Sequence, residues 1–293
     1  MKRVLLTGAS GFIGRNAIAP LIAKGYEVHA VSSKEQIDGI HGVHWHLVNL
    51  LETKDIGRLM SKVRPTHLLH FAWYAEHGKF WRSPENFRWL EASIAILRHF
   101  QQAGGQRVVM AGTCAEYDWN YGYCKESVTP CRPETPYGVC KNALQELLRA
   151  YSGEEKLSSA WGRIFLPYGP GEDSRRLIPS LVAVFKGNQP PFGINATAIR
   201  DFLHVDDVAA GFVQLLEADV IGEYNVCSGH PVELTSVVHQ IAHFYGADPS
   251  AILDLSTKRP GDPKILVGSN QKLLELGWGA RNLFADMPKN LGL

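Results

Sequence analysis

The sequence has no excess of charge of either sign, few cysteines and no long apolar run, and each of these features excludes a class of protein. Thirty basic and 29 acidic side chains leave a net charge of +1, so nothing predicts binding to nucleic acid or to an anionic membrane. Hydrophobic residues make up 45% of the 293 residues of the chain, which excludes an intrinsically disordered protein. The first apolar run, residues 4–6, is too short for a signal peptide or a membrane span. We therefore expect a globular, cytoplasmic protein.

Patterns that would indicate disulfides or a metal site are also scarce. The five cysteines, at positions 114, 124, 131, 140 and 227, are odd in number, and no two have CxxC spacing. Free thiols in a reducing compartment are the expectation. His41, His44 and His46 lie close together in the sequence without an accompanying cluster of cysteines or carboxylates. An exposed strand or loop explains them better than a metal site, so no metal is predicted.

Short apolar strands alternate with helices along the first half of the chain. Strands separated by helices predict an α/β protein with a doubly wound parallel sheet, a Rossmann fold. We assign residues 1–166 and 200–230 to this dinucleotide-binding domain. The proline-rich segment 167–199 and the mixed tail 231–293 are assigned to a small substrate-binding lobe beside the carboxyl ends of the strands. The expected strands are 3–7, 28–31, 43–48, 66–71, 107–111, 159–165 and 223–227, and the expected helices are 12–24, 55–62, 83–103, 136–151 and 206–218.

A glycine-rich turn follows the first expected strand. Residues 7–14 read Thr-Gly-Ala-Ser-Gly-Phe-Ile-Gly, with the glycines spaced GxxGxxG. Missing Cβ atoms allow a tight turn and the close approach of a pyrophosphate, and the helix N-terminus offers N–H donors. A turn without a ligand is the alternative, but the strand before it and the helix after it favour dinucleotide binding. The predicted cofactor contacts are Gly8, Ser10, Gly11, Phe12, Ile13 and Gly14.

The end of the second expected strand bears on the choice between NAD and NADP. An acidic residue there binds the ribose 2′-hydroxyl of NAD, whereas basic or small polar residues admit the 2′-phosphate of NADP. The chain has Ser32, Ser33 and Lys34 at this place, and Glu35 follows too late. A solvated loop that touches no ligand is the alternative. The pattern favours NADP(H) over NAD(H).

Tyr137 and Lys141 stand four residues apart at the start of an expected helix, so they share a face. A lysine ammonium about 5 Å from a phenol, at an effective dielectric constant of about 20, favours the phenolate by roughly 3 kcal/mol. We therefore expect Lys141 to lower the pKa of Tyr137 toward neutrality, which suits proton exchange with a carbinol or carbonyl. Thr113, just past the fifth strand, is placed to hydrogen-bond the same reacting oxygen. The alternatives are an ordinary surface helix and a turn-forming hydroxyl.

Taken together, these residues resemble the extended short-chain dehydrogenase/reductase family, in its nucleotide-sugar branch of NAD-dependent epimerases, dehydratases and ketoreductases. The resemblance covers nearly the whole chain, and its most specific motif outside the cofactor site is RDFLHVDDV at residues 200–208. The other matching segments are YGPG at 168–171 after Arg163, YNV at 224–226 with Gly229, RPGD at 259–262 and LGW at 276–278.

The resemblance implies a role for each matching residue. Tyr137 is then the catalytic acid/base, Lys141 its partner, and Thr113 the hydroxyl on the substrate oxygen. Arg200 and Arg259 match positions that hold the nucleotide diphosphate, since guanidinium groups suit phosphate oxygens. Further cofactor contacts are expected at Asn49, Leu50, Phe71, Ala72 and Trp73, and further substrate contacts at Trp73, Tyr74, Cys114, Glu116 and Leu166.

Departures from the family pattern narrow the reaction. Dehydratases carry an acidic pair directly after the catalytic threonine, where this chain has Cys114 and Ala115. Glu116 is displaced by one position, so dehydration is disfavoured. Leu166 stands where an asparagine is usual, which leaves a phosphate contact there open. The aromatic run between residues 71 and 81 either stacks on a sugar or base, or forms a small core under a long loop.

The resemblance predicts an enzyme, most simply a 4-ketoreductase that reduces a nucleotide-linked 4-keto-6-deoxy sugar while Tyr137 protonates the oxygen. A 4-epimerase that uses the same three residues is the first alternative. A non-catalytic dinucleotide sensor is the second, although such proteins typically lose the tyrosine or the lysine. By resemblance we also expect a homodimer that pairs helices 83–103 and 136–151, a nucleotide-sugar ligand, and no nucleic-acid or membrane partner.

Overall fold

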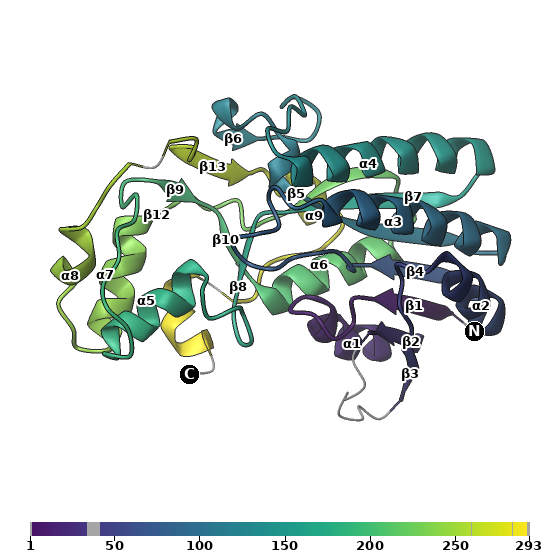
Figure 1. Cartoon of the computed structure of the whole chain (residues 1–293), viewed down its shortest axis with the longest axis horizontal. Helices are drawn as coiled ribbons and strands as arrows, with labels where there is room; N and C mark the ends of the chain where they lie inside the picture. Colours follow the sequence, from purple (N-terminus) through teal and green to yellow (C-terminus); the bar gives the residue numbers. More distant parts are fainter. Residues whose placement is uncertain (1, 34–41, 259, 283, 292–293) are drawn as a thin grey trace.

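The computed structural model describes residues 2–33, 42–258, 260–282 and 284–291. Its centre is a sheet of seven parallel strands in the order β11-β7-β5-β4-β1-β2-β3. This confirms the predicted doubly wound fold (Figure 1). The strands are β1 (Arg3–Thr7), β2 (Glu27–Ser32), β3 (Val43–Leu47), β4 (His67–His70), β5 (Arg107–Thr113), β7 (Ser158–Ile164) and β11 (Gly222–Val226).

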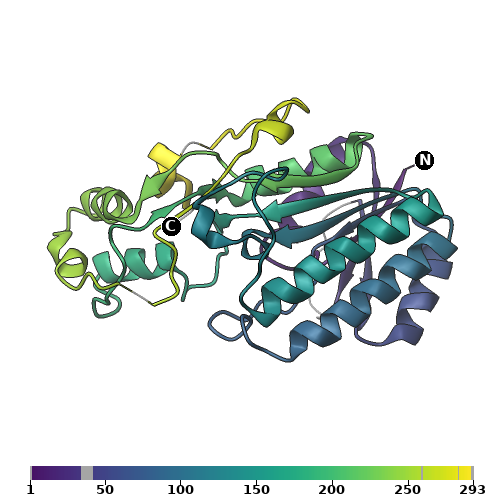
Figure 2. The same cartoon turned by 90° about the horizontal axis from the view of Figure 1, so that it is seen from above.

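Helices cover both faces of the sheet (Figure 2). On one face, α1 (Gly14–Ala23) and α6 (Val205–Glu217) enclose an apolar core, and on the other face α2 (Thr53–Val63), α3 (Glu85–Gln102) and α4 (Pro136–Glu155) enclose a second. The strands between them are buried on both faces, which explains why they read as continuous apolar runs instead of alternating patterns. Pro20 lies inside α1, and the helix continues past it to Ala23.

The strand order reverses between β1 and β4, because the chain moves outward to β2 and β3 before it returns to β4. Open α/β sheets bind their ligands at such a switch point, outside the carboxyl ends of the strands. These two strand ends are joined by side chains: Thr7 Oγ1 lies 2.6 Å from His70 Nδ1 and accepts the N–H of Ala72 at 3.3 Å. The sheet therefore presents a fixed edge on which a site can be built.

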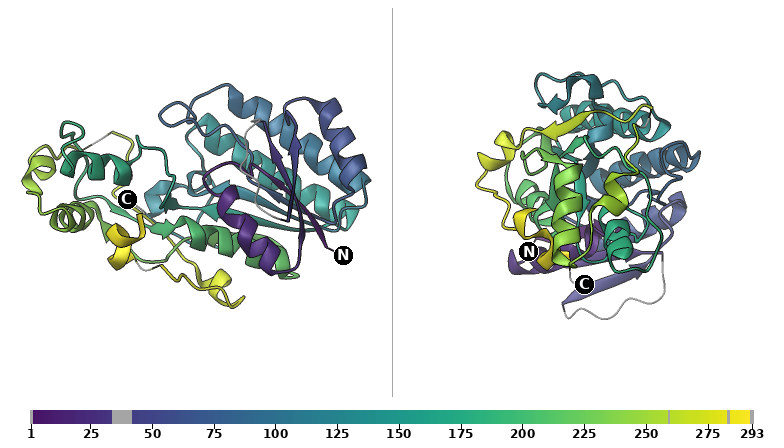
Figure 3. Two further views of the ribbon diagram at one scale, coloured as in Figure 1. Left: turned by 90° about the horizontal axis from the view of Figure 1, so that it is seen from below. Right: turned by 90° about the vertical axis from the view of Figure 1, so that its left-hand side faces the viewer.

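A smaller lobe lies at the carboxyl-terminal end of the strands, opposite the amino terminus (Figure 3). Its apolar core is formed by α5 (Leu177–Phe185), α7 (Leu234–Phe244), α8 (Ser250–Leu253) and the 3-10 helix η3 (Phe284–Leu291). Short strands join the lobe to the sheet domain: β6 (Tyr123–Cys124), β8 (Leu166–Tyr168), β9 (Ile199–Arg200), β10 (Phe202–His204), β12 (Val232–Glu233) and β13 (Ile265–Gly268).

One part of the chain assigned to the lobe lies elsewhere. The tail segment with α9 (Gln271–Leu274) returns to the sheet domain, where Leu273 and Trp278 pack into the core beside α1 and α6. Trp278 also donates its indole N–H to the carbonyl of Asp207 on α6, at 3.1 Å. The assignment of residues 231–293 to the lobe is therefore wrong for this segment, because the tail supplies apolar surface that α6 would otherwise leave exposed.

Two further features concern the described residues only. No helix among them is long and apolar enough to cross a membrane. The part of the chain that the structure describes also has no group of three or more His, Cys, Asp or Glu side chains arranged to hold a metal ion. His44 and His46 lie on β3, where both rings stack against His29 of β2, with ring centroids 4.9 and 5.2 Å apart. His41 lies outside the described residues.

Candidate active site

The glycine turn after β1 is shaped for a close ligand. Gly8 has a φ of +67°, and a Cβ there would lie 2.8 Å from the backbone nitrogen of Ala72. A Cβ on Gly14 would lie 2.1 Å from the Gly8 carbonyl oxygen. No side chain caps the N-terminus of α1, and its first turn holds no acidic residue. The N–H of Gly11 donates to the Gly8 carbonyl at 2.9 Å, and the uncapped N-terminus of α1 beside it fits the pyrophosphate of a dinucleotide. Ser10, Gly11, Phe12 and Ile13 lie on the same turn.

The residues predicted to hold the adenosine half lie beside this turn. The Ser32 hydroxyl, at the end of β2, donates to the Ser10 hydroxyl at 3.2 Å, and Ser33 is exposed next to it. Asn49 is exposed after β3 and accepts the N–H of Leu51, while Leu50 is buried against the core under β2. Lys34, the third residue of the NADP prediction, lies outside the described residues.

Thr113 and Tyr137 are brought together by a close approach of α4 to the end of β5. The hydroxyl of Thr135 accepts the N–H of Gly138 at 3.2 Å and caps α4, with Pro136 in its first turn. A Cβ on Gly138 would lie 2.4 Å from the carbonyl oxygen of Ala115, so only glycine allows the helix to come so near. As a result, the Thr113 and Tyr137 side chains lie close enough to interact.

The electrostatics of this pair differ from the prediction. Burial raises the pKa of Tyr137 above its ordinary value, and the neighbouring Thr113 hydroxyl only partly opposes this effect. Burial also lowers the pKa of Lys141 to about 7. The expected lowering of the Tyr137 pKa by a lysine ammonium is therefore wrong for this structure. A buried lysine loses much of its charge near neutral pH, and a buried phenol keeps its proton.

Lys141 has its own partners behind the tyrosine. Its Nζ donates to the carbonyl of Ala111 on β5 at 2.7 Å and lies 3.9 Å from the ring centroid of Trp73. Trp73 is fixed in turn, because its indole N–H donates to the buried Asn86 at 2.9 Å. Trp73 therefore covers the lysine at the switch point, next to the predicted cofactor residues Phe71 and Ala72.

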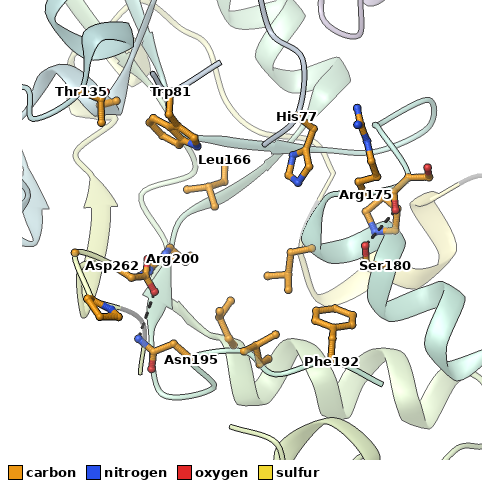
Figure 4. A pocket seen from close by; sticks show the side chains of 18 of the residues that line it. His77, Trp81, Thr135, Leu166, Arg175, Ser180, Phe192, Asn195, Arg200 and Asp262 are labelled. Atoms are coloured by element: carbon orange, nitrogen blue, oxygen red, sulfur yellow. Dashed lines mark hydrogen bonds and ion pairs between the residues drawn. The ribbon is translucent and has the colours of Figure 1, made fainter. Parts of the chain in front are cut away.

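A cavity of about 1150 Å³ opens between the sheet domain and the lobe (Figure 4). Of the predicted substrate residues, Leu166 and Arg200 line it. Arg200 donates to the carboxylate of Asp262 at 2.5 Å, and both lie at the lobe end of the cavity. Ala115 and Thr135 line the other end, next to Thr113 and Tyr137. Arg259 lies outside the described residues.

Four predicted substrate residues do not line this cavity: Trp73, which instead covers Lys141, and the three described next. Glu116 is fully buried and forms an ion pair with Arg163 at 2.6 Å. Cys114 is buried in a small apolar cluster beneath the turn. The Tyr74 hydroxyl donates to Glu76 in its own loop at 2.9 Å. These three side chains therefore pack against, or bond to, neighbouring protein groups and do not face the cavity where the predicted substrate contacts would be made.

Several cavity residues were not predicted. Trp81 lies in the aromatic run after β4, and its ring centroid is 5.7 Å from that of Tyr137 and 6.1 Å from that of Trp119. The run thus forms a small aromatic cluster, and Trp81 is the member that faces the cavity. The high aromatic content of the run is the sequence signal that could have identified Trp81. Other lining residues come from α5, from the 3-10 helix η2 (Trp119–Tyr121) and from loops that carry no sequence motif, and they include Trp119, Arg82, Arg175, Phe192 and Asn195.

Comparisons with known proteins agree with this geometry. The model of the NAD dependent epimerase/dehydratase family matches residues 4–227. A UDP-glucose 4-epimerase of Cyamopsis tetragonoloba is 27% identical, over 96% of this chain and 90% of that protein. The dTDP-6-deoxy-L-talose 4-dehydrogenase (NAD(+)) of Aggregatibacter actinomycetemcomitans is 25% identical, over 81% of this chain and 88% of that protein.

Similar solved structures lead to the same family. The UDP-glucose 4-epimerase of Thermus thermophilus, solved in complex with NAD, is 27% identical with a TM-score of 0.84 and covers 99% of this chain and 97% of its own. MoeE5, solved with UDP-glucose and NAD, is 25% identical with a TM-score of 0.85 and covers the same shares. The chain therefore belongs to the NAD-dependent epimerase/dehydratase family, in the nucleotide-sugar branch of the extended short-chain dehydrogenases/reductases.

Proposed function

We propose that this protein is an NAD(P)-dependent 4-ketoreductase that acts on a nucleotide-linked 4-keto-6-deoxy sugar. The observation that carries the proposal is the close pair of Thr113 and Tyr137, which lies beside Ala115 and Thr135 at one end of a cavity of about 1150 Å³. Such a volume is ample for a ligand of nucleotide-sugar size. A relative that is a dTDP-sugar 4-dehydrogenase supports the same carbon and the same class of sugar.

The residues of this chain divide the work between binding and proton transfer. A nicotinamide cofactor, when bound, supplies the hydride for the carbonyl carbon. The glycine turn and the N-terminus of α1 hold the pyrophosphate of that cofactor. Tyr137 gives its proton to the carbonyl oxygen as that oxygen gains charge, and Thr113 hydrogen-bonds the same oxygen. Arg200 faces the nucleotide diphosphate at the far end of the cavity.

The raised pKa of Tyr137 suits the direction of reduction. A phenol that keeps its proton at neutral pH is ready to donate it, and a sugar alkoxide is a much stronger base than a phenolate. Dehydration is not supported, because Cys114 and Ala115 offer no acid and Glu116 is committed to Arg163. The arrangement therefore suits a single proton transfer, from Tyr137 to the carbonyl oxygen of the substrate.

The test is incubation of the purified protein with NADPH and a nucleoside-diphosphate 4-keto-6-deoxyhexose. We expect loss of NADPH absorbance in step with a product heavier than the substrate by two hydrogens. Mass spectrometry of the sugar nucleotide reads the product directly. Isomerisation of the sugar without net loss of NADPH would reject the reductase.

A 4-epimerase is the second candidate, and the names of several relatives favour it. It would use the same pair of side chains in both directions, with the sugar turning over between two hydride transfers. Incubation with UDP-glucose and a catalytic amount of NAD distinguishes the two. Formation of the C4 epimer with no net change in the cofactor supports the epimerase.

A non-catalytic dinucleotide sensor is the remaining alternative. The assembled Thr113, Tyr137 and Lys141 argue against it, because a protein that only binds a dinucleotide has no use for this arrangement. Binding of NADPH with no turnover on any member of a nucleotide-sugar panel would favour the sensor.

The proposed cofactor is NADP(H) in preference to NAD(H). Support comes from the end of β2, where Ser32 and Ser33 stand in place of an acidic residue and Ser32 bonds to the phosphate-binding turn through Ser10. The ratio of kcat/KM for NADPH and NADH tests this preference. A ratio in favour of NADH would reject it and align the protein with the relatives solved with NAD.

We also propose a homodimer in a reducing cytosol. The helices α3 and α4 pack side by side and expose Phe87, Val139 and Leu147 to solvent (Figure 1). The five cysteines are free thiols, as expected for that compartment. Sedimentation equilibrium gives the mass in solution, and a single species of monomer mass would reject the dimer.

A further inference from the structure

Glu116 lies beneath the turn that carries Thr113, and its side chain is fully buried. Its Oε1 accepts the backbone N–H of Thr113 at 2.8 Å. The Thr113 side chain in turn accepts the N–H of Ala115 at 3.2 Å, and the two residues close a capping box on the 3-10 helix η1 (Cys114–Glu116). The orientation of Thr113 is therefore tied directly to this carboxylate.

The neighbouring strand holds the same carboxylate from the other side. The indole N–H of Trp161 on β7 lies 3.1 Å from both carboxylate oxygens, and Nε of Arg163 donates to Oε2 at 2.6 Å. Gly112 makes this possible, because a Cβ there would lie 2.5 Å from Oε1 of Glu116 and 2.0 Å from the indole nitrogen. The glycine leaves room for the ion pair between β5 and β7.

Arg163 is committed to the same network through its remaining nitrogens. One terminal nitrogen donates to the hydroxyl of Tyr117 at 3.2 Å and the other to the sulfur of Cys131 at 3.3 Å. Burial is the largest single effect and acts to lower the pKa of Arg163, but the charge and hydrogen bond of Glu116, together with Tyr117 and Cys131, outweigh it, and the net effect is a raised pKa. A guanidinium held in this way keeps its charge beside the Glu116 carboxylate.

Stability does not by itself account for such a pair, because apolar side chains of similar volume often replace a buried ion pair without loss. The charge of Glu116 also extends to the catalytic lysine. Burial lowers the pKa of Lys141 to about 7, and Glu116 opposes this shift. The charge of Glu116 also contributes to the raised pKa of Tyr137, so Glu116 acts on all three residues that perform the proposed chemistry.

On the basis of the proposed function, we propose that Glu116, paired with Arg163, is a positioning residue that orients Thr113 through the backbone N–H. The negative charge of Glu116 also favours the cationic form of Lys141. Two other titratable side chains belong to this region. His70 approaches Lys141 from β4, and burial lowers the pKa of His70 to about 3, so it stays neutral in the alkaline range. Tyr137 lies on the same helix as Lys141.

A double variant, Glu116→Gln with Arg163→Met, tests the charge. It keeps an acceptor for the N–H of Thr113 and leaves no guanidinium stranded in the interior. We expect a folded protein with an unchanged KM and an alkaline limb of kcat/KM that lies roughly one pH unit lower, since Lys141 then loses its proton at lower pH. A pH profile that superimposes on that of the unmodified protein would overturn the proposal.

Asp207→Asn is the matched control. Asp207 is also a buried carboxylate, but it binds the backbone N–H groups of Arg281 and Asn282, away from the catalytic turn. This variant is expected to lower the melting temperature without shifting the pH profile. A shift of equal size in this control would show that any buried carboxylate has the same effect, and would overturn the specific role of Glu116.

Two further measurements cover the remaining outcomes. The pH dependence of NADPH binding, followed by the fluorescence of the reduced cofactor, needs no substrate. A shifted binding profile in the double variant, with no turnover on any sugar nucleotide, would uphold the positioning role and reject the proposed function. Should the double variant fail to fold, Glu116→Asp decides: it keeps the charge but shortens the reach to Thr113, so kcat should fall roughly tenfold with an unchanged pH profile. An unchanged kcat would overturn the proposal.

Discussion

The two walls of the cavity are built in different ways. Directly behind the sheet-domain wall, Thr113, Lys141 and Glu116 are 7%, 3% and 0% exposed. Lys141 is bonded to β5, Glu116 to β7, and Thr113, at the end of β5, to Glu116. On the lobe wall, the Arg200 side chain is 7% exposed, but that of its partner Asp262 is 31% exposed and that of Arg175 is 54% exposed. A buried, bonded group has one geometry, whereas an exposed charged group can adjust to its ligand.

The difference between the walls is also electrostatic. Burial changes the protonation of the sheet-domain wall, lowering the pKa of Lys141 to about 7 and raising that of Tyr137. On the lobe wall, hydrogen bonding to Asp173 raises the pKa of Arg175, so its positive charge persists. We infer that the sheet domain determines what reaction occurs and that the lobe determines what is bound. If this division is correct, substitutions on the sheet-domain side should mainly change kcat, and substitutions on the lobe wall should mainly change KM.

The largest effect is expected from Tyr137→Phe. Removal of the hydroxyl takes away the proton donor and the partner of Thr113, and the phenyl ring keeps its contacts with Phe80 and Trp81. We expect kcat to fall by roughly 10² to 10⁴-fold with little change in the dissociation constant of NADPH. Steady-state kinetics and cofactor fluorescence measure the two quantities. Retention of most of the activity would remove the proposed mechanism and, with it, the division between the walls.

The sheet domain should also respond to acid. Burial lowers the pKa of His46 and of His67 to about 4 and that of His70 to about 3, and all three lie on β3 or β4. Because these folded-state values lie below the unfolded value of 6.5, the unfolded chain binds more protons at low pH. Their contribution to stability is therefore complete above about pH 6.5 and is lost as the pH falls toward these values.

For the fully buried His70 the loss amounts to about 5 kcal/mol at the acid end, on the order of 1.4 kcal/mol for each pKa unit. Urea unfolding at a series of pH values measures it. His70→Gln, which leaves a neutral side chain between Thr7 and Ser93, is the variant for comparison and should flatten the acid limb. A free energy of unfolding that stays constant from pH 7 to pH 4 would contradict this prediction.

The next largest effect is expected on substrate binding by the lobe wall. Arg200→Ala removes the cation that faces the proposed diphosphate, and hydrogen bonds to charged groups are worth about 1.5–3 kcal/mol. We expect KM for the nucleotide sugar to rise roughly 10 to 100-fold with a much smaller change in kcat. Asp262→Asn is the control, since it releases Arg200 from its ion pair and should not raise KM. A fall in kcat as large as that in Tyr137→Phe would break the division.

The sheet-domain wall could be predicted from the sequence because its signals are local. The glycine turn, the YxxxK pair and Thr113 each lie within a few residues of a strand or helix end, and apolar runs locate those ends. The partner of Glu116 could not be found in this way, because Arg163 lies 47 residues away and meets it only through the pairing of β5 with β7. Long-range register, not local pattern, decides which polar groups become buried together.

The lobe wall is harder to predict, and for a different reason. Arg175 and Phe192 come from loops between short elements, where no periodicity reports which way a side chain faces. The same difficulty applies to Trp73, which lies after β4 in the sheet domain. It was predicted as a cofactor and substrate contact on the basis of its position, but its stacking over Lys141 depends on Asn86, thirteen residues further along the chain. Side chains of this kind acquire their roles only when the folded loops meet.

The smallest effect is expected from Arg175→Ala, which tests the adaptable character of the lobe wall. The Arg175 side chain lines the cavity but is 54% exposed and already held by Asp173, with its Nε and one terminal nitrogen on the two carboxylate oxygens. Ion pairs in such exposed places are screened by solvent and contribute little, so we expect KM to change by less than about threefold. The same variant measured at low ionic strength should show a somewhat larger effect, because screening weakens there. An increase in KM as large as that of Arg200→Ala would place Arg175 among the residues that hold the substrate phosphates, and would show that exposure on this wall does not separate weak contacts from strong ones.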